Sequence, residues 1–502
     1  MPDSSLDEEK RSSLTDIYRG ASMFFIGRLL SKGLKFGLNV VLTRGLGASL
    51  YGIYAYATTL TSLAVVLARF GAGQSLLRFI PAYEDNPAYR DHLVGLAYLT
   101  ALLGSVLIGS ALYLLAPIIS ELTLDNPLFV DVLRIFALVL PFNSIIKLTN
   151  AVFRGLKQLE YQVIVADVVH PVTQIGVVTI GLLLGYSLLG VVASLAVGAI
   201  LVCLVAVTLL YARTPLRPDV AGRQRRMGVR EFYSYSVPLT LKDVGSILYN
   251  RIDILMVGFF LAESTVGIYR IAVLVSGLLV LPLNAFNQLF TPVASQLYTE
   301  GDVTELQSVY ETITRWTLTV AIPPALVAAL YSPELLAVFG SEFSAGGLVL
   351  TLFAVGQLTN CAVGPSGYLL MMTDHQYLTM ANQWLLGALN VVLNYVFILE
   401  FGLIGAALAT AGVLSFINVI RVCEVWYTEG MTPYSTVYWK PLAAGALSGA
   451  VMAALSGVVG GYVLLVVGAL VGGMVFVGTL FVLGIEQDDR KFFTRIVGER
   501  LQ

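Results

Sequence analysis

The sequence predicts an all-α integral membrane protein with about fourteen transmembrane helices, arranged as two six-helix lobes plus two extra C-terminal helices. Of its 502 residues, 57% are hydrophobic and 12% are charged, against roughly 45–50% and about 25% in soluble domains. Apolar windows of about 20 residues, enough to cross a bilayer core, recur along the chain. Runs such as "LLGSVLIGSALYLLAPII" do not alternate in polarity as the strands of a membrane barrel would, so the spans are predicted to be helices.

Polar breaks between the apolar windows delimit the expected helices one by one. Their approximate ranges are 20–43, 50–72, 92–116, 128–153, 160–184, 187–212, 232–260, 265–292, 308–331, 346–372, 377–399, 403–427, 436–459 and 461–484. The segment that precedes the first helix is polar and lacks the apolar core and cleavage site of a signal peptide. The expected organisation is an N-terminal tail (1–19), an N-lobe (20–213), an Arg-rich linker (214–230), a C-lobe (231–430), helices 13 and 14 (431–485) and a C-terminal tail (486–502).

The distribution of Lys and Arg predicts the orientation. With a cytoplasmic N-terminus, the outer loops hold only Arg44, whereas the inner segments collect most of the other cations, as the positive-inside rule requires. An even number of spans then places both termini in the cytoplasm. The expected location is the plasma membrane. The densest basic run, "RTPLRPDVAGRQRRMGVR" at 213–230, is interpreted as a linker and topology determinant, with a lipid or partner site as the alternative.

An internal repeat relates the two lobes. "YGIYAYA" at 51–57 and "VGIYRIA" at 266–272 both follow the first helix of their lobe. The spacing between these two motifs also relates Tyr83 to Tyr298. Several matches at one spacing on corresponding spans indicate duplication. Because each lobe has an even number of helices, the copies are expected to share one orientation, with the repeat axis along the membrane normal.

The first helix carries a polar stripe formed by Arg28, Lys32, Lys35 and Asn39, which fall within an arc of roughly 60° on a helical wheel. A Lys or Arg at the bilayer centre costs about 2.5–3.5 kcal/mol, so this face is predicted to line a wet cavity. Snorkelling to the headgroups is the alternative and suits Arg28 best. The corresponding positions of helix 7 are also polar: Lys242, Ser246, Tyr249 and Asp253.

Further polar groups inside the spans extend the candidate site. The predicted substrate-binding residues are Arg28, Lys32, Lys35, Asn39, Arg69, Lys242, Arg251 and Arg270. Lys147 and the asparagines Asn382, Asn390 and Asn394 are additional cavity candidates. Candidates for ion coupling are Asp253, Asp167 and His170. Asp167 and His170 are i, i+3 neighbours that could form a proton relay or a buried hydrogen bond, and Asp253 could equally pair with a nearby cation.

No enzyme motif is present in the sequence. It contains no GxxxxGK[ST], HExxH or GxSxG pattern, each of which marks a catalytic or nucleotide site. Cys203, Cys361 and Cys423 lack CxxC spacing and nearby His, so neither a disulfide framework nor a metal site is expected. We expect no catalytic residues, no cofactor, no metal and no nucleic-acid partner, and therefore transport without ATP hydrolysis by this chain.

Residues 42–85 resemble the second-helix region of the polysaccharide-biosynthesis transporters, the flippases of lipid-linked oligosaccharides. The resemblance is carried by Arg44-Gly-Leu-Gly before the turn, Tyr51-Gly-Ile-Tyr entering the second helix, and Leu77-Arg78-Phe79-Ile80 leaving it. Chain length and helix plan match that family over essentially the whole sequence. The family lies in the multidrug/oligosaccharidyl-lipid/polysaccharide exporter superfamily, which also contains multidrug extruders and the flippases of the peptidoglycan lipid precursor.

The resemblance implies alternating access, in which two bundles expose a central site first to the cytoplasm and then outside. It also implies a cationic cavity in the lipid flippases and cavity carboxylates in the cation extruders. Since the stripe on the first helix is basic and two extra helices follow the lobes, the expected substrate is a polyprenyl-(di)phosphate-linked oligosaccharide. The expected flippase acts as a monomer among membrane lipids, with H+ or Na+ as candidate coupling ions.

Two rival functions stay open at this point. The first is a cation-coupled multidrug exporter of the same fold. The second is a membrane glycosyltransferase or polymerase acting on the same lipids, which would require acidic catalytic residues on a sizeable loop. The sequence shows no such loop, so the flippase is the preferred prediction.

Overall fold

The computed structural model describes residues 3–219 and 227–484, and the side chains of residues 3–29, 227–228, 244 and 246–250 are outside that description. Within these ranges the chain forms helices joined by short turns and contains no strand, which confirms the all-α prediction. The predicted C-terminal tail at 486–502 lies outside the described residues. The chain divides into two compact units, unit 1 (Met1–Gly267) and unit 2 (Ile268–Gln502).

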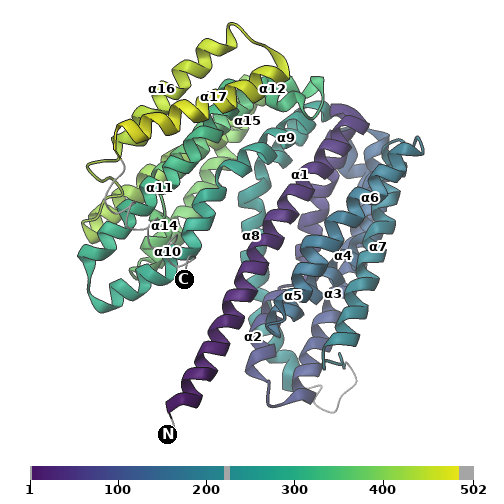
Figure 1. Cartoon of the computed structure of the whole chain (residues 1–502). Helices are drawn as coiled ribbons and strands as arrows, with labels where there is room; N and C mark the ends of the chain where they lie inside the picture. Colours follow the sequence, from purple (N-terminus) through teal and green to yellow (C-terminus); the bar gives the residue numbers. More distant parts are fainter. Residues whose placement is uncertain (1–2, 220–226, 485–502) are drawn as a thin grey trace. The chain divides into compact units, whose positions relative to one another are not determined.

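Unit 1 is a bundle in which α1, α3, α4, α6 and α7 lie side by side (Figure 1). Its elements are α1 (Asp3–Arg69), α2 (Ala72–Ala82), α3 (Pro87–Glu121), α4 (Pro127–Gly155), α5 (Leu159–Gln162), the π-helix η1 (Val163–Val169), α6 (His170–Leu183), α7 (Leu188–Arg213), α8 (Met227–Phe260) and the start of α9 (Glu263–Leu279). The fully buried rings of Phe153 and Phe232 and the nearly buried ring of Phe79 belong to one core cluster that joins α2, α4 and α8. Burial of such aromatic rings is the main apolar contribution to bundle packing.

The helix boundaries follow local sequence signals. Asn86 and Asn126 cap α3 and α4: each side-chain oxygen accepts a backbone N–H of the first turn, and a proline follows at the start of the helix. This is the usual arrangement of a capping residue and an early proline. Predicted helices 1 and 2 are continuous in α1 except at Gly47, where φ is 74° and ψ is 176°. A residue without Cβ tolerates that conformation, so the predicted break is a sharp bend.

Unit 2 is also entirely helical within its described residues. Its elements are the rest of α9, then α10 (Leu281–Glu300), α11 (Val303–Leu330), α12 (Ser332–Ala337), the 3-10 helix η2 (Ser341–Gly346), α13 (Gly347–Ala362), α14 (Ser366–Met372), α15 (Gln376–Glu429), α16 (Trp439–Ser456) and α17 (Gly461–Val482). Predicted helices 11 and 12 are joined in α15 by a bend at Gly402. The extra helices α16 and α17 pack on each other and on α11, at the yellow end of the colour scale in Figure 1.

Each of the fourteen predicted spans corresponds to helical structure. Among the described residues, nine helices are long and apolar enough to cross a membrane, or up to ten if the bent pair α9 and α10 is one span. This count takes α1 and α15 as single helices, although each contains two of the predicted spans. The protein is therefore a multi-pass membrane protein.

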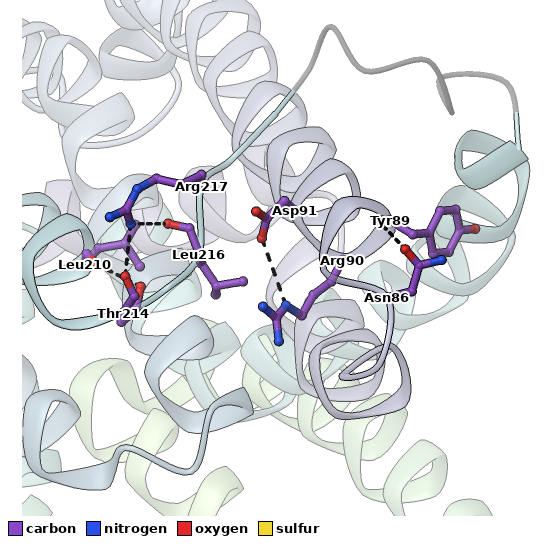
Figure 2. Close-up of polar contacts among 8 residues, drawn as sticks. All are labelled: Asn86, Tyr89, Arg90, Asp91, Leu210, Thr214, Leu216 and Arg217. Atoms are coloured by element: carbon purple, nitrogen blue, oxygen red, sulfur yellow. Dashed lines mark hydrogen bonds and ion pairs between the residues drawn. The ribbon is translucent and has the colours of Figure 1, made fainter.

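The first part of the predicted Arg-rich linker is docked onto α3. Leu216 is fully buried, and the backbone N–H of Asp219 donates to the carbonyl of Asp91 at 3.1 Å. The Nδ1 atom of His92 lies 3.2 Å from the Asp219 carbonyl oxygen. Figure 2 shows how Arg217 folds back so that its Nη1 donates to the carbonyls of Thr214 (2.9 Å) and Leu216 (2.8 Å). The linker residues 214–219 are thus part of unit 1.

The boundary between the compact units differs from the predicted lobe boundary at residue 230. Helix α8 was expected to open the C-lobe, but it packs against α1, α2 and α3 within unit 1. The hydroxyls of Tyr83 and Tyr89 donate to the two carboxylate oxygens of Glu231, at 2.8 and 2.7 Å. The Ser75 and Ser236 hydroxyls are 2.6 Å apart. These contacts, which no local sequence pattern reveals, tie the first turns of α8 to the helices that precede it.

The repeat spacing reappears as a reciprocal backbone contact inside unit 1. A Cβ added at Gly52 would lie 1.7 Å from the carbonyl oxygen of Glu263, and a Cβ added at Gly267 would lie 2.3 Å from that of Ala48. The spacing of the two Gly-Ile-Tyr motifs separates Gly52 from Gly267, and it also separates Ala48 from Glu263. The two copies of the motif therefore meet in a symmetric crossing that only glycine permits.

Candidate functional site

Basic side chains of α1 and α4 gather beside η1 in unit 1. Lys147 interacts electrostatically with Arg69, Lys35, Arg154 and Asp167. His170 interacts in the same way with Lys147 and Lys35. We call these residues the cationic cluster: Lys35, Arg69, Lys147, Arg154, Asp167 and His170.

Helix geometry brings the two basic residues of α4 to one face. Lys147 and Arg154 are seven residues apart, which is close to two helical turns. Both side chains are exposed, as is Lys35 on α1. Among the side chains that the structure describes, no carboxylate forms an ion pair with the side-chain nitrogens of Lys35, Lys147 or Arg154. The cluster therefore presents accessible positive charge that no described side chain neutralises by direct pairing.

Arg69, at the end of α1, is held more firmly than the other cations. Its side chain is half-buried, and its Nε donates to the Val65 carbonyl at 3.3 Å. It interacts electrostatically with Asp243 of α8 and with Arg154. Asp243 thus offsets part of the charge at this end of the cluster.

A π-helical turn positions Asp167 and His170. Pro171 lacks the N–H that would bond to the Asp167 carbonyl, and its ring would clash with that carbonyl in a regular α-helix. The chain instead forms η1, and the His170 N–H donates to the carbonyl of Val165, five residues back. Such π turns are frequent at functional sites. Asp167 and His170 share no hydrogen bond among the described contacts, so the proton relay stays a prediction.

The predicted basic stripe of the first helix is only partly described. The side chain of Arg28 lies outside the described residues, and Lys32 is half-buried. Asn39 accepts a hydrogen bond from the Tyr51 hydroxyl at 2.5 Å, and its Nδ2 donates to the Lys35 carbonyl at 2.7 Å. The bond to Tyr51 therefore connects the two sides of the bend at Gly47, whereas the bond to Lys35 stays within the helix before the bend.

The candidate residues on α8 and α9 are not among the residues of the cationic cluster. Lys242 is exposed, Arg251 is half-buried, and the side chains of Ser246 and Tyr249 lie outside the described residues. Asp253 is buried, and its Oδ1 accepts the N–H of Ile254 at 2.8 Å. Arg270 is half-buried and belongs to unit 2. Substrate contact by these residues stays a prediction.

Sequence reasoning missed two residues with a clear place at the cluster, Arg154 and Asp243. Arg154 was counted only among the inner-loop cations, although its spacing of seven from Lys147 indicates a shared helix face. Asp243 follows Arg28 at the spacing of the two Gly-Ile-Tyr motifs, so the repeat could have singled it out. The helix 7 positions matched to helix 1 in the sequence, beginning at Lys242, are one residue short of that spacing, so Lys242 takes the place of Asp243.

Comparison with known proteins decides the family. The family model described as polysaccharide biosynthesis protein matches residues 17–298, more than half of the chain. The chain belongs to the polysaccharide biosynthesis protein family. A second model, MatE, matches residues 238–396, which agrees with the superfamily named from the sequence.

Two relatives from Haloferax volcanii resemble this member of the family. The probable low-salt glycan biosynthesis flippase Agl15 is 24% identical over 441 residues, covering 87% of this chain and 89% of the relative. The probable flippase AglR is 27% identical over 238 residues, or 46% of this chain and 49% of the relative.

Solved structures show the same fold. The inward closed conformation of the lipid II flippase MurJ aligns with a TM-score of 0.71 at 13% identity, covering 94% of this chain and 99% of that one. An inward-facing multidrug resistance MATE family transporter aligns with a TM-score of 0.67 at 13% identity, covering 80% and 94%. Both likenesses concern the fold, so the substrate has to be argued from the site.

Proposed function

We propose that the protein is a flippase that moves a polyprenyl-(di)phosphate-linked oligosaccharide across the cytoplasmic membrane by alternating access. The observation that supports this most is the cationic cluster, because Lys35 and Lys147 are exposed and not ion-paired within the described residues. A phosphate or diphosphate that leaves water must exchange its hydration for other favourable contacts. Cations at the depth of the membrane provide such contacts, while the prenyl tail stays in lipid.

Several charges of moderate strength suit a transport site better than one tight clamp. A substrate bound very strongly would be released slowly, because affinity differences appear mainly in the dissociation rate. Lys35 and Lys147 offer electrostatic attraction on flexible stems, and Arg offers a rigid bidentate fork. Asp167 lies close enough to interact with Lys147 and moderates the attraction. We therefore assign phosphate binding to Lys35, Lys147 and Arg154, and orientation of the cluster to Arg69.

The proposal includes no covalent step and no cofactor. Transport requires only binding, reorientation and release, driven by the substrate gradient or by H+ or Na+ moving with it. The proposed orientation has both termini in the cytoplasm, and the proposed working form is a monomer. Asp167, His170 and Asp253 are the groups we propose for ion coupling.

The decisive experiment measures lipid crossing in vesicles. Purified protein is reconstituted with a polyprenyl diphosphate that carries a fluorescent disaccharide, and an impermeant reductant reports the label reaching the outer leaflet. Lys147→Glu should slow crossing by roughly tenfold or more, because a charge reversal converts attraction of several kcal/mol at close range into repulsion. Lys147→Arg should retain part of the rate.

The matched control is Arg213→Glu, a charge reversal at an exposed position at the end of α7. It should leave the crossing rate unchanged and insert normally. Equal rates for wild type, Lys147→Glu and a Lys35→Glu variant would contradict the phosphate-binding role.

A cation-coupled exporter of the same fold is the second candidate, supported by the MatE match over residues 238–396. The same vesicles distinguish it. Uptake of a fluorescent organic cation driven by an imposed H+ or Na+ gradient, without crossing of the diphosphate lipid, would replace the flippase proposal.

A further inference from the structure

A groove of about 430 Å³ runs between α3 and α4, and no residue of the cationic cluster lines it. Its apolar walls include Val106, Leu114 and Leu138, whose side chains are 53%, 72% and 65% exposed. The groove exists because Gly109 brings the helices close at its floor: a Cβ there would lie 2.9 Å from the Ala137 carbonyl oxygen. Pro141, within α4, also lines it. On a membrane-spanning bundle, such an open apolar hollow fits a flexible hydrocarbon chain.

One end of the groove carries a cation. Tyr113 lines the groove, and the Arg134 guanidinium carbon lies 5.2 Å from the centre of the Tyr113 ring. Arg134 precedes Leu138 by four residues on α4, so the two side chains are neighbours on one face. Helical side chains lean toward the N-terminus of their helix, which directs Arg134 away from the middle of α4 and toward its capped start at Asn126.

Arg134 has hydrogen-bonding capacity that the protein does not use. Its Nε is buried and has no hydrogen-bond partner. Among the described residues, Asp131, one turn earlier, makes no ion pair with it. At the other end of the groove, the polar groups are satisfied, since the Ser105 hydroxyl donates to Ser144 at 2.8 Å. The Arg134 end of the groove therefore has a buried donor without an acceptor among the described residues, and an anion would supply one while balancing the positive charge.

We propose that this groove binds an anionic phospholipid, with one acyl chain between α3 and α4 and the phosphate at Arg134. Arg134 lies about 10 Å along the helix from Pro127, within reach of the headgroup region for a long side chain. A second copy of the chain is a poorer occupant. A two-fold interface would place the same face on both partners, so it would bring two Arg134 cations into one interface.

The test compares lipid retention by native mass spectrometry. The purified protein is exposed to equal amounts of phosphatidylglycerol and phosphatidylcholine with identical chains. Wild type should retain phosphatidylglycerol preferentially in its tightest bound position, and Arg134→Gln should lower that preference several-fold. Ser110→Trp, which fills the groove from an exposed position on α3, should lower retention of both lipids there.

Arg213→Gln is the matched control for removal of an exposed arginine and should keep the wild-type preference. Thermal unfolding of each variant in detergent shows whether it is folded. An unchanged lipid preference in folded Arg134→Gln overturns the proposal. A wild-type dimer that dissociates when Ser110→Trp is introduced also overturns it, because a second copy would then cover the groove. Neither result bears on the cationic cluster, so this proposal stands or falls separately from the flippase function.

Discussion

Among single residues, Glu231 has an unusually large part in joining secondary-structure elements. Its carboxylate accepts hydrogen bonds from two tyrosine hydroxyls that lie on either side of the turn between α2 and α3. The bond to Glu231 is the main cause that raises the pKa of the Tyr83 phenol above its usual value. One carboxylate thus attaches the start of α8 to two earlier helices, and the neutral phenol is the form that it stabilises.

Removing this acceptor charge should destabilise the fold. A hydrogen bond to a charged group contributes about 1.5–3 kcal/mol, so Glu231→Gln should lower the thermal unfolding midpoint in detergent at neutral pH. The matched control is Glu84→Gln, an exposed position in the same turn, which should have almost no effect. Equal midpoints for the two variants would show that the phenol contacts contribute little.

The sign of the pH dependence follows from the raised pKa of Tyr83. The contribution of this hydrogen bond is complete below the usual phenol pKa of 10.0 and is lost as the pH rises through the higher value in the folded protein. The difference between wild type and Glu231→Gln should therefore be constant from neutral pH to about pH 9 and shrink in stronger base.

The sequence identifies individual candidate site residues only where the pattern of polar residues within a single helix points to them. Lys35 is a candidate from the sequence alone because it shares a face with Lys32 in an apolar segment, where a cation is costly; its contact with substrate stays a prediction. The packing of α1, α4 and η1 brings Lys147 within electrostatic range of Arg69 and Asp167. No local sequence pattern specifies this packing. The repeat spacing singles out Asp243, but its electrostatic interaction with Arg69, which lies on another helix, follows only from the packing of α1 and α8.

At the scale of helices, local chemistry predicted the elements well and their grouping less well. Glycine-containing polar breaks correctly marked the ends of predicted helices at Gly47 and Gly402, because positive φ ends regular helix geometry there. The π turn at η1 was not predicted, although Pro171 is a sufficient physical cause. The lobe boundary was expected at the basic linker, whereas α3 is hydrogen-bonded to the linker residue Asp219, and Tyr83 and Tyr89 are hydrogen-bonded to Glu231 at the start of α8. Both segments therefore belong to unit 1.

The close contact between Gly52 of α1 and Glu263, at the start of α9, should be sensitive to a single methyl group. Gly52→Ala places a Cβ against the Glu263 carbonyl oxygen, which is backbone and cannot rotate away. Overpacking of this kind typically costs about 1–3 kcal/mol. We expect a lower unfolding midpoint and less monodisperse protein after heating, measured by size-exclusion chromatography.

Gly176→Ala, inside α6, is the control for this substitution. No atom lies within 4 Å of the added Cβ at that position, and alanine favours a helix over glycine by up to about 1 kcal/mol. The thermal unfolding midpoint of Gly176→Ala should equal or exceed that of the wild type. If Gly52→Ala melts like Gly176→Ala, the helices do not cross as closely as described.

At the scale of the whole molecule, the arrangement of spans can be tested by labelling. In a variant lacking Cys203, Cys361 and Cys423, single cysteines replace Glu121 and Ser341, which precede α4 and α13, or Asp85, which precedes α3; all three positions are exposed. With a cytoplasmic N-terminus, an impermeant maleimide should label the first two from outside intact cells and leave Asp85→Cys unlabelled. The reason is the Lys and Arg asymmetry between the two sides.

Permeabilised cells supply the control, since all three cysteines should then react. Labelling of Asp85→Cys in intact cells, with protection of the other two, would invert the proposed orientation. It would also place the end of the cluster near Arg69 on the opposite side of the membrane from the one we propose.

The meeting of Gly52 with Gly267 also has a meaning for the history of the chain. In an isologous dimer, residue i of one copy touches residue j of the other, and j touches i; the crossing obeys this rule within a single polypeptide. Before the two copies were fused, one glycine would have served both sides of a homodimer. Because the contact engages carbonyl oxygens and no side chains, the partner positions could diverge to Ala48 and Glu263, and Glu263 now accepts a hydrogen bond from Ser49 at 3.1 Å. The two glycines are therefore still required at this symmetric contact, whereas the side chains of the residues that they touch can differ between the two copies.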